Sequence, residues 1–490
     1  MDLQKFSFAH FGNVDSRIFS LLSFLVPLVM RALPEIFMGK YIIGFDTVSY
    51  YIPVTLRWIN GGVGFFEFIA RAPLFYVLLM QLTLVGVPLT VSLKVLPPIL
   101  HGFLGFAIYL YARRGLGWSY KRGLFVSCLA TLYFVGLRIS WDMLRSELGL
   151  IFLFLFLTLL HEGLDKKSWK RFGLLLLVMA LVVLSHQLVG VVMFAVVSVL
   201  VFQKVVRREY FEGVNLILCS LPAVVLFSLT VYASYVVLPS AESAGWFSLF
   251  GFSSFFDAAV DTLGFLVYCF LPLLPFAFLG FRCFNNLELK TWLAWCLVAI
   301  LFPIVSPYAI FPWSYRWILL LGFPLSFFVV EGLRRFNSRW RKVVLSGVSV
   351  LLSSSFVLLP AMFAFPYFRV FPYYVPSSML QNSVPLSDCE DVVNALSWVR
   401  DDVGFDGVLL VHDAFHGWAL LLLDRSRVVC YGYGDPEEAA WEMCENGYSR
   451  LYLVWWVSGE GWHGWSTLPS SFVKVFHSNR IAVYTYKSAV

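Results

Sequence analysis

Long apolar runs separated by short polar stretches fill the first three quarters of the chain. At about 1.5 Å per helical residue, such runs approach the roughly 30 Å thickness of the hydrocarbon layer of a bilayer. The predicted spans are residues 18–36, 94–112, 123–137, 146–162, 172–186, 188–203, 214–237, 262–281, 291–305, 317–333 and 343–362. The pattern therefore predicts a polytopic α-helical membrane protein with about eleven spans.

Residues 72–92 fit two interpretations. They are apolar enough to cross the membrane, yet they contain Gln81, Gly86 and Pro88. If they cross, Asp46 moves to the cytoplasmic side. If they lie on the outer surface as an amphipathic or partly buried helix, residues 37–93 form one large outer loop. Periodicity alone leaves both interpretations open.

From about residue 386 the composition changes to that of an ordinary globular protein. Helical and strand-like segments then alternate, which predicts a small layered α/β domain over 386–490 after a membrane domain over 1–365. The predicted segments are a helix at 388–402, a strand at 407–412, a short helix at 420–423, a strand at 427–431, a helix at 436–446, a strand at 451–456 and a hairpin of 472–476 with 481–486. Neither a GxGxxG nor a Walker lysine motif is present, so no nucleotide site is indicated.

Composition supports a lipid environment. Hydrophobic residues make up 59% of the 490 positions and charged residues only 13%, which is too apolar for a soluble protein of this size. The formal net charge is +6. Most of the basic residues fall in short loops, where membrane topology explains them, so we expect membrane lipids as partners and no nucleic acid.

The basic residues also predict an orientation. They concentrate in every second loop, at 113–122, 166–171, 204–208, 282–290 and 334–342, whereas the intervening loops carry only Arg138, Arg145 and Arg316. The positive-inside rule makes the first set cytoplasmic. The N-terminus is then cytoplasmic and the C-terminal domain extracytoplasmic.

The spacing of cysteines and histidines does not indicate a metal-binding site. The tail carries Cys389, Cys430 and Cys444, two of which could form a disulfide in an oxidising compartment. His412 and His416 have HxxxH spacing. Without a third ligand or a Glu after the first His, we do not expect a zinc site there.

Ionisable groups near membrane depth are costly, so each one is a candidate for function. Asp46 lies in an aromatic stretch shortly after the first predicted span, and either a functional carboxylate or a helix N-cap would explain it. Asp142 and Arg145 stand three positions apart. They predict a local ion pair at the start of a helix, or a site for phosphate or metal.

Three further candidates lie near the predicted outer ends of spans. His186, between the fifth and sixth spans, is either a packing residue or a ligand. Arg316 stands among aromatic residues and is either an interfacial anchor or a phosphate-binding group. Glu67 and Arg71 belong to the same outer region if residues 72–92 do not cross, and their spacing predicts an i,i+4 pair.

Taken together, these features resemble the membrane-embedded glycosyltransferases of the GT-C superfamily. That group includes oligosaccharyltransferase catalytic subunits, protein mannosyltransferases and aminoarabinose transferases. The resemblance rests on the acidic Asp46 in Gly-Phe-Asp-Thr-Val-Ser-Tyr-Tyr, on the loop that begins Arg71-Ala72-Pro73, on Asp142 at a second acidic position and on the tail. It favours leaving residues 72–92 on the outer surface, and archaeal-type members are the most similar in character.

The sequence also departs from that group. Val454-Trp455-Trp456-Val457 lacks the Asp of the oligosaccharyltransferase acceptor motif, and the first loop lacks the paired Asp-Glu of protein mannosyltransferases. The resemblance implies an inverting transfer of sugar from a polyprenyl phosphate, such as dolichyl phosphate, to a lipid-linked or protein acceptor. The departures leave the acceptor unassigned.

By the same resemblance, Asp46 would be the general base, and Arg316 with Arg145 would neutralise the phosphate. Asp142 and His186, with Glu67 and Arg71 nearby, would orient donor or acceptor or hold a divalent metal such as Mg²⁺ or Mn²⁺. Two other classes remain open. A polyprenyl-lipid flippase or transporter would place polar groups near the midplane, and a noncatalytic assembly protein would tolerate the loss of Asp46.

Overall fold

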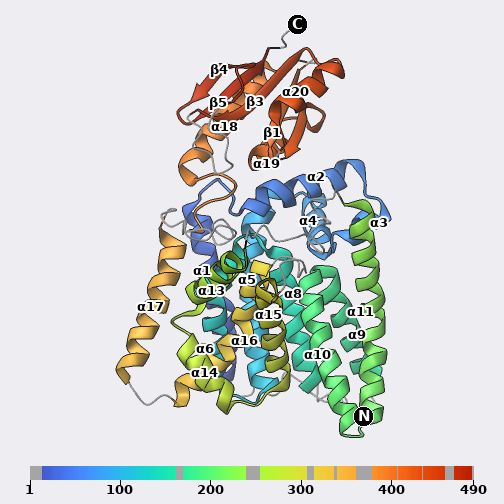
Figure 1. The fold of residues 1–490 in the computed structure, drawn as a ribbon, viewed down its shortest axis with the longest axis vertical. Helices are drawn as coiled ribbons and strands as arrows, with labels where there is room; N and C mark the ends of the chain where they lie inside the picture. Colours follow the sequence, from blue (N-terminus) through green and yellow to red (C-terminus); the bar gives the residue numbers. More distant parts are fainter. Residues whose placement is uncertain are drawn as a thin grey trace. The chain divides into compact units, whose positions relative to one another are not determined.

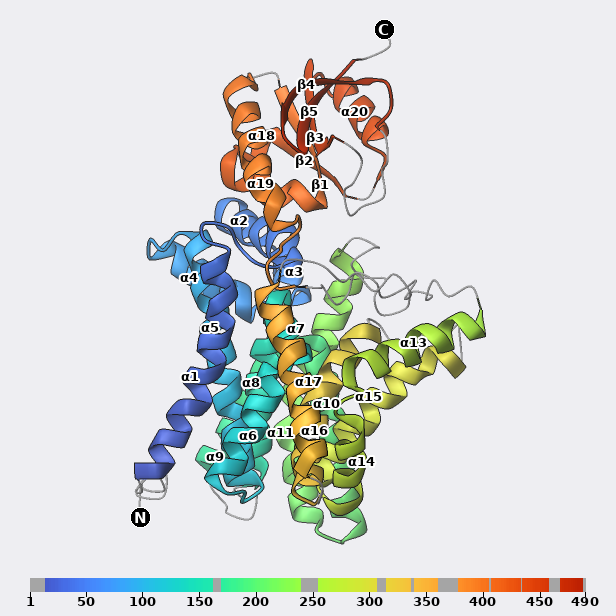
Figure 2. The ribbon, with the colours of Figure 1, turned by 90° about the vertical axis from the view of Figure 1, so that its left-hand side faces the viewer.

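The structure, a computed structural model, describes residues 14–161, 169–238, 254–305, 314–335, 339–359, 378–404, 407–432, 434–457 and 468–487. The chain divides into two compact units. The helical unit comprises Met1–Leu33, Val63–Leu78 and Val95–Ser377, and the sheet unit comprises Pro34–Gly62, Leu79–Lys94 and Ser378–Val490. Figures 1 and 2 show the first as a bundle of helices and the second as helices around one twisted sheet. Residues 360–377, which contain the predicted end of the membrane domain at 365, lie outside the described residues.

Helices account for nearly all of the described chain before residue 360. They are α1 (Val14–Phe37), η3 (Thr47–Tyr51), α2 (Ile52–Gly61), α3 (Phe65–Ala70), α4 (Leu74–Leu84), α5 (Leu89–Leu110), η4 (Tyr111–Gly115), α6 (Tyr120–Leu132), α7 (Phe134–Asp142), α8 (Leu144–His161), α9 (Trp169–Ser185), α10 (Gln187–Val206), α11 (Tyr210–Val237), α13 (Phe255–Phe270), α14 (Leu274–Cys283), α15 (Leu287–Val305), α16 (Ser314–Arg335) and α17 (Arg339–Leu358). Both η3 and η4 are π-helical.

The apolar helices are those of a multi-pass membrane protein. The predicted number of eleven membrane-spanning helices is not confirmed. Among the described residues, six helices are long and apolar enough to cross a bilayer, and eight spans result if each of two bent pairs counts as one. The bends are 59° between α6 and α7 and 84° between α13 and α14. Hydropathy counts an apolar run as one straight segment, so it cannot register such bends.

The ambiguous segment at residues 72–92 forms α4 and the start of α5. With 11 residues, α4 is about 16 Å long, roughly half of the hydrocarbon thickness. Its end is a Schellman-type cap: Gly86 has a φ of 94°, its N–H donates to the Thr83 carbonyl, and the Val87 N–H donates to the Leu82 carbonyl. This helix is too short to cross the bilayer by itself.

Two glycines bring the backbones of α14 and α16 into direct contact. A Cβ at Gly280 would lie 1.8 Å from the Phe328 carbonyl oxygen, and a Cβ at Gly332 would lie 1.9 Å from the Phe276 carbonyl oxygen. Small residues allow such close packing between helices in lipid, where dispersion replaces the hydrophobic effect as the main attraction.

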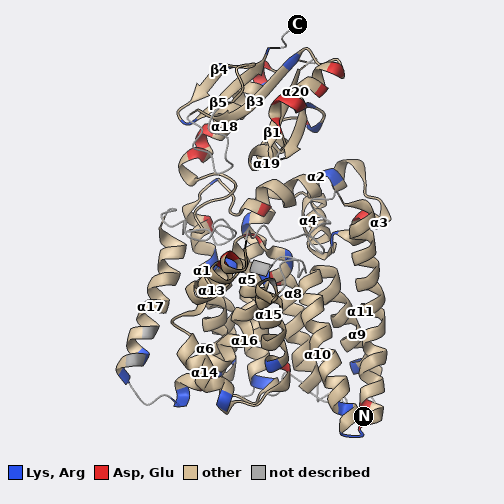
Figure 3. Cartoon of the chain, in the orientation of Figure 1, with Lys and Arg blue, Asp and Glu red and all other residues tan. Residues whose placement is uncertain are grey.

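Basic side chains mark one end of the helical bundle. Figure 3 shows Lys and Arg gathered at the lower end of this bundle, where α14, α16 and α17 turn. Some of them are paired there, since Arg122 and Arg335 both form ion pairs with Glu331. This charge asymmetry is the basis of the predicted orientation, which stays a prediction.

The sheet unit contains one five-stranded sheet in the order β2-β1-β3-β5-β4. Its strands are β1 (Gly407–His412), β2 (Val428–Gly432), β3 (Arg450–Trp456), β4 (Phe472–Ser478) and β5 (Ile481–Tyr486), and its helices in this part of the chain are α18 (Cys389–Asp402), α19 (Asp413–Leu422) and α20 (Pro436–Glu445). The pairs β1–β2 and β1–β3 are parallel, and β3–β5 and β4–β5 are antiparallel. Every residue of the inner strand β1 is buried, as the apolar run at 408–411 predicts.

The C-terminal α/β fold agrees with the sequence prediction. The predicted parallel arrangement holds for three strands, and the predicted hairpin supplies the antiparallel pair. The predicted short helix that includes residues 420–422 begins at Asp413, where the His412 side chain caps it by accepting the Ala414 N–H at 3.1 Å. All eight cysteines are free, so the structure forms none of the disulfides considered among Cys389, Cys430 and Cys444.

Candidate functional site

Asp46 lies in the sheet unit, at the first turn of a helical segment. It occupies the N-cap position of the π-helix η3, but its side chain makes no capping hydrogen bond. Its carboxylate is half-buried. Of the two predicted explanations, capping is therefore not what the carboxylate does. A π-helical turn of this kind often occurs at functional sites, because it re-aims side chains relative to an α-helix.

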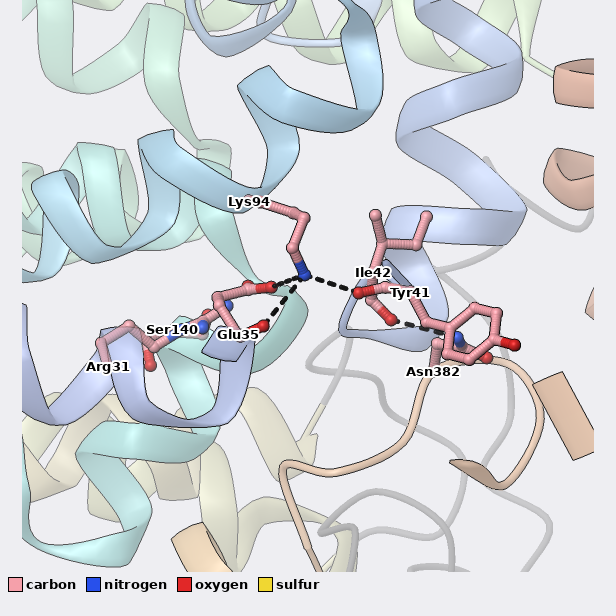
Figure 4. Close-up of polar contacts among 7 residues, drawn as sticks. All are labelled: Arg31, Glu35, Tyr41, Ile42, Lys94, Ser140 and Asn382. Atoms are coloured by element: carbon pink, nitrogen blue, oxygen red, sulfur yellow. Dashed lines mark hydrogen bonds and ion pairs between the residues drawn. The ribbon is translucent and has the colours of Figure 1, made fainter. Parts of the chain in front are cut away.

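Lys94 anchors the segment that leads to Asp46. Its ammonium donates to the Glu35 carbonyl and carboxylate, both at 3.1 Å, and to the Tyr41 carbonyl at 2.6 Å (Figure 4). These bonds use all three N–H donors of a lysine. Lys94 thus positions the loop rather than offering its charge to a ligand.

The segment after residue 377 holds the same loop from another direction. The Asn382 side chain donates to the Ile42 carbonyl at 3.0 Å, as Figure 4 shows, and the Gly44 N–H donates to the Gln381 carbonyl at 3.1 Å. Gly44 has a φ of 97°, in the left-handed region that favours glycine. The turn just before Asp46 is therefore fixed by backbone conformation as well as by hydrogen bonds.

Close backbone packing supports the turn that follows Asp46. A Cβ at Gly417 in α19 would lie 1.8 Å from the Val48 carbonyl oxygen. Only glycine permits this approach, so α19 and η3 are held against each other at this point. The position of Asp46 therefore depends on residues that stand more than 300 positions away in the sequence.

In the helical unit, Arg145 is tied to the end of α3. Its Nη1 donates to the Arg71 carbonyl at 2.6 Å, and its guanidinium carbon lies 5.6 Å from the centre of the Tyr76 ring. Arg71 itself is buried and forms the predicted i,i+4 pair with Glu67, at 3.7 Å between Nε and Oε1. The preceding carbonyl, of Ala70, accepts from Gln187 and Ser234. This short helix is thus fastened to α8, α10 and α11.

His186 is buried and lies within electrostatic range of Arg145 and Arg316. It lies between α9 and α10, and its Nδ1 has no hydrogen-bond partner among the described residues. Burial, and then the positive charges of Arg145 and Arg316, lower the pKa of His186 well below its usual range. The imidazole is therefore neutral at pH 7. We refer to Arg145, His186 and Arg316 as the arginine cluster.

Asp142 and Arg145 lie on two different helices. Asp142 is the last residue of α7, Arg145 lies in the next helix, and Met143 between them has a non-helical ψ of 48°. Because the chain breaks there, the i,i+3 spacing does not place the two side chains on one helix face. Asp142 pairs with Arg138, one turn earlier in α7, and both are buried.

Among the described residues, the predicted metal ligands belong to no group of three ligand-type side chains. Among the described residues, one set of three His, Cys, Asp or Glu side chains has ligand atoms within 4.8 Å of one another, namely Asp413, His416 and Cys430. Asp142, His186 and Glu67 are not in it. A requirement for Mg²⁺ or Mn²⁺ in the helical unit stays a prediction.

The structure thus places Arg145 and Arg316 within electrostatic range of His186, and it joins Arg145 to the Arg71 carbonyl by a hydrogen bond. Asp46 belongs to the other unit. Pro312 and Trp313, which flank Arg316 in the sequence, lie outside the described residues. Sequence reasoning missed the buried Arg31, whose Nε donates to the Ser140 carbonyl at 3.0 Å (Figure 4). It also missed Lys94 and Arg138. Each of these three residues, Arg31, Lys94 and Arg138, is a charged residue within or beside an apolar run, which is the sequence feature that could have identified it.

Comparison with solved structures identifies the fold. The crystal structure of ArnT from Cupriavidus metallidurans, bound to undecaprenyl phosphate, matches with a TM-score of 0.56 over 99% of this chain and 99% of that chain, at 14% sequence identity. The chain has the ArnT fold. ArnT has a GT-C fold, so the fold class expected from the sequence is confirmed. No protein-family description and no curated protein sequence matches the chain. The closer relationship to archaeal-type members stays a prediction.

Proposed function

We propose that this protein is a membrane glycosyltransferase that takes a sugar from a polyprenyl-phosphate donor. The observation that carries the proposal is the arginine cluster: the guanidinium groups of Arg145 and Arg316 lie within electrostatic range of the buried His186, and the Arg71 carbonyl holds Arg145 in place. Guanidinium groups suit phosphate oxygens. The ArnT fold, which in C. metallidurans binds undecaprenyl phosphate, supports the same ligand class here.

In the proposed reaction Asp46 is the general base. An acceptor hydroxyl or amide attacks C1 of the sugar, and its proton passes to the Asp46 carboxylate. The bond from C1 to the phosphate oxygen breaks, and the polyprenyl phosphate leaves with the electron pair, so the configuration at C1 inverts. Arg316 and Arg145 would stabilise the charge that develops on the phosphate. Asp142, whose partner is Arg138, and the Glu67–Arg71 pair would hold the surrounding elements in place.

The predicted orientation puts this chemistry on the outer face of the membrane. The acceptor would be a lipid-linked molecule or a protein, and the polyprenyl group would be undecaprenyl or dolichyl. A panel of donors with both lipids therefore forms the first assay. Each donor is offered to the purified protein in lipid nanodiscs, with and without a metal chelator, and the consumed donor and the product are identified by mass spectrometry.

Asp46→Asn tests the base. We expect it to abolish turnover, since proton acceptance contributes on the order of 10²- to 10⁴-fold, while thermal unfolding and donor binding stay unchanged. The matched control is Asp401→Asn, which alters an exposed carboxylate in the same unit. Near wild-type turnover by Asp46→Asn would refute the assignment. A protein that moves donor lipids without consuming them would be a flippase, and one that does neither would be an assembly protein.

Arg316→Gln tests the phosphate site separately. A lost charge-assisted hydrogen bond costs about 1.5 to 3 kcal/mol, so donor binding should weaken roughly 10- to 100-fold. Arg335→Gln is the control, because Arg335 lies at the other end of the same helix and pairs with Glu331. Equal effects of the two substitutions would remove the arginine cluster from the donor site.

A further inference from the structure

A second group of ligand-type side chains lies in the sheet unit, where two parallel strands end. Asp413 directly follows β1 and is the first residue of α19, and His416 comes one helical turn later. Cys430 is the third residue of the neighbouring strand β2, in a pair that runs parallel. The carboxyl ends of parallel strands are where open α/β sheets place their binding sites.

The three side chains converge from different elements. Their ligand atoms all lie within 4.8 Å of one another, and the Cys430 Sγ is 3.1 Å from Asp413 Oδ1. Zinc bonds of about 2.0 to 2.3 Å in a tetrahedron require ligand atoms roughly 3.3 to 3.8 Å apart. Small side-chain rotations therefore suffice to close the group around one ion. All three residues are half-buried, so an ion can reach them.

The other histidine of the HxxxH pair has a different role. His412 accepts the Ala414 N–H through Nδ1, and its ring packs edge-on against Tyr431 and Trp455. It is a helix cap in an aromatic pocket. The HxxxH motif therefore contributes only His416 to the group, together with Asp413 between the two histidines. Cys430, 14 positions after His416, is the third ligand-type residue.

Protonation of the three groups is compatible with a metal ion at neutral pH. Burial, and then Arg425 and Arg57, lower the pKa of His416 to about 4, so its ring nitrogen is available without loss of a proton. Burial, and then Asp413, raise the pKa of Cys430, and the thiol donates its hydrogen bond to that carboxylate. Metal binding would displace the thiol proton, with one proton released for each ion bound. The two arginines oppose a cation and would reduce its affinity.

We propose that Asp413, His416 and Cys430 bind one Zn²⁺ ion, with the fourth position taken by water or an external ligand. The mixture of one sulfur, one nitrogen and one oxygen suits zinc, whereas Mg²⁺ and Ca²⁺ prefer oxygen ligands alone. The ion would join the ends of β1 and β2 to the start of α19. This site is separate from the arginine cluster and does not depend on the proposed transferase activity.

The test uses the full-length purified protein, first stripped of metal with a chelator. Titration with Co²⁺ should produce the near-ultraviolet charge-transfer band of a cobalt–thiolate bond at one ion per chain, and Zn²⁺ should abolish the band by competition. Cys430→Ser should remove the band. His416→Gln and Asp413→Asn should weaken zinc binding by at least the roughly 10- to 100-fold typical of outer-sphere substitutions.

Cys444→Ser is the matched control, because Cys444 is a second half-buried free thiol of the same unit, and it should leave the band intact. A measurement on the unmodified protein guards against misfolded variants: Zn²⁺ should protect Cys430, and not Cys444, from alkylation, as followed by peptide mass spectrometry. Absence of the band in the wild-type protein, or equal protection of both cysteines, would overturn the proposal.

Discussion

The arginine cluster of the helical unit and the Asp413–His416–Cys430 group of the sheet unit differ in how readily the sequence reveals them. In the helical unit, Arg145, His186 and Arg316 stand out because ionisable groups are rare beside apolar spans and expensive to keep there. In the sheet unit Asp46 stands out for the same reason, but Asp413, His416 and Cys430 are ordinary residues of a globular domain. They become a candidate site only when β1 and β2 pair. In lipid, the free-energy cost of burying an ionisable group marks that group as a functional candidate. In a globular domain, candidate residues are recognised only after the fold brings them together.

The sharpest test of this contrast compares ion pairs in the two units. Arg138→Gln removes the guanidinium that pairs with the buried carboxylate of Asp142, so we expect the free energy of unfolding to fall by about 3 to 5 kcal/mol. Arg400→Gln removes the exposed Arg400–Asp401 pair of the sheet unit and should cost about 0 to 1 kcal/mol. Unfolding in denaturant, followed in nanodiscs, measures both.

The double variant Arg138→Gln with Asp142→Asn supplies the control. It removes both charges, so most of the lost stability should return. If the single variant were as stable as wild type, burial would not make charge costly in the helical unit. The rarity of Arg145, His186 and Arg316 beside apolar spans would then no longer indicate a function.

A second prediction concerns the backbone contact that positions Asp46. Gly417→Ala would force a Cβ into the Val48 carbonyl, and overpacking of this kind costs about 1 to 3 kcal/mol. Turnover should fall with it, because η3 must move. Gly61→Ala is the control, since the nearest atom to its Cβ is the flexible end of Arg425, at 3.6 Å. A Gly417→Ala protein with normal stability and turnover would contradict the contact.

The smallest predicted effect is a pH dependence of stability. Because the pKa of His186 is lower in the folded protein than its usual value near 6.5, the unfolded state binds more protons below that pH. The stabilisation is complete above about pH 6.5 and is lost as the pH falls toward the folded-state pKa. His186→Asn should flatten this part of the curve. Thermal unfolding from pH 7.5 to 5 measures it, and identical curves for the two proteins would contradict the buried neutral state.

The sequence predicted the fold class and most helix positions, because long apolar runs and alternating strands depend on local patterns. Local patterns failed where the chain breaks. Asp142 and Arg145 were expected to share a helix, but Met143 separates α7 from α8. The apolar runs at α6–α7 and α13–α14 were each read as one span, although they bend. The convergence of Cys430 with His416 could not be predicted, since strand pairing is a long-range property that spacing does not encode.

The glycine-capped turn between α4 and α5 offers a practical route to the orientation of the protein. Val85 is 77% exposed, and the cap at Gly86 closes the helix with its own backbone hydrogen bonds. Exposed loop tips tolerate inserted sequence when their flanking backbone is satisfied. An epitope placed after Val87, just beyond these bonds, would therefore be bound by antibody on intact cells only if this turn faces outward.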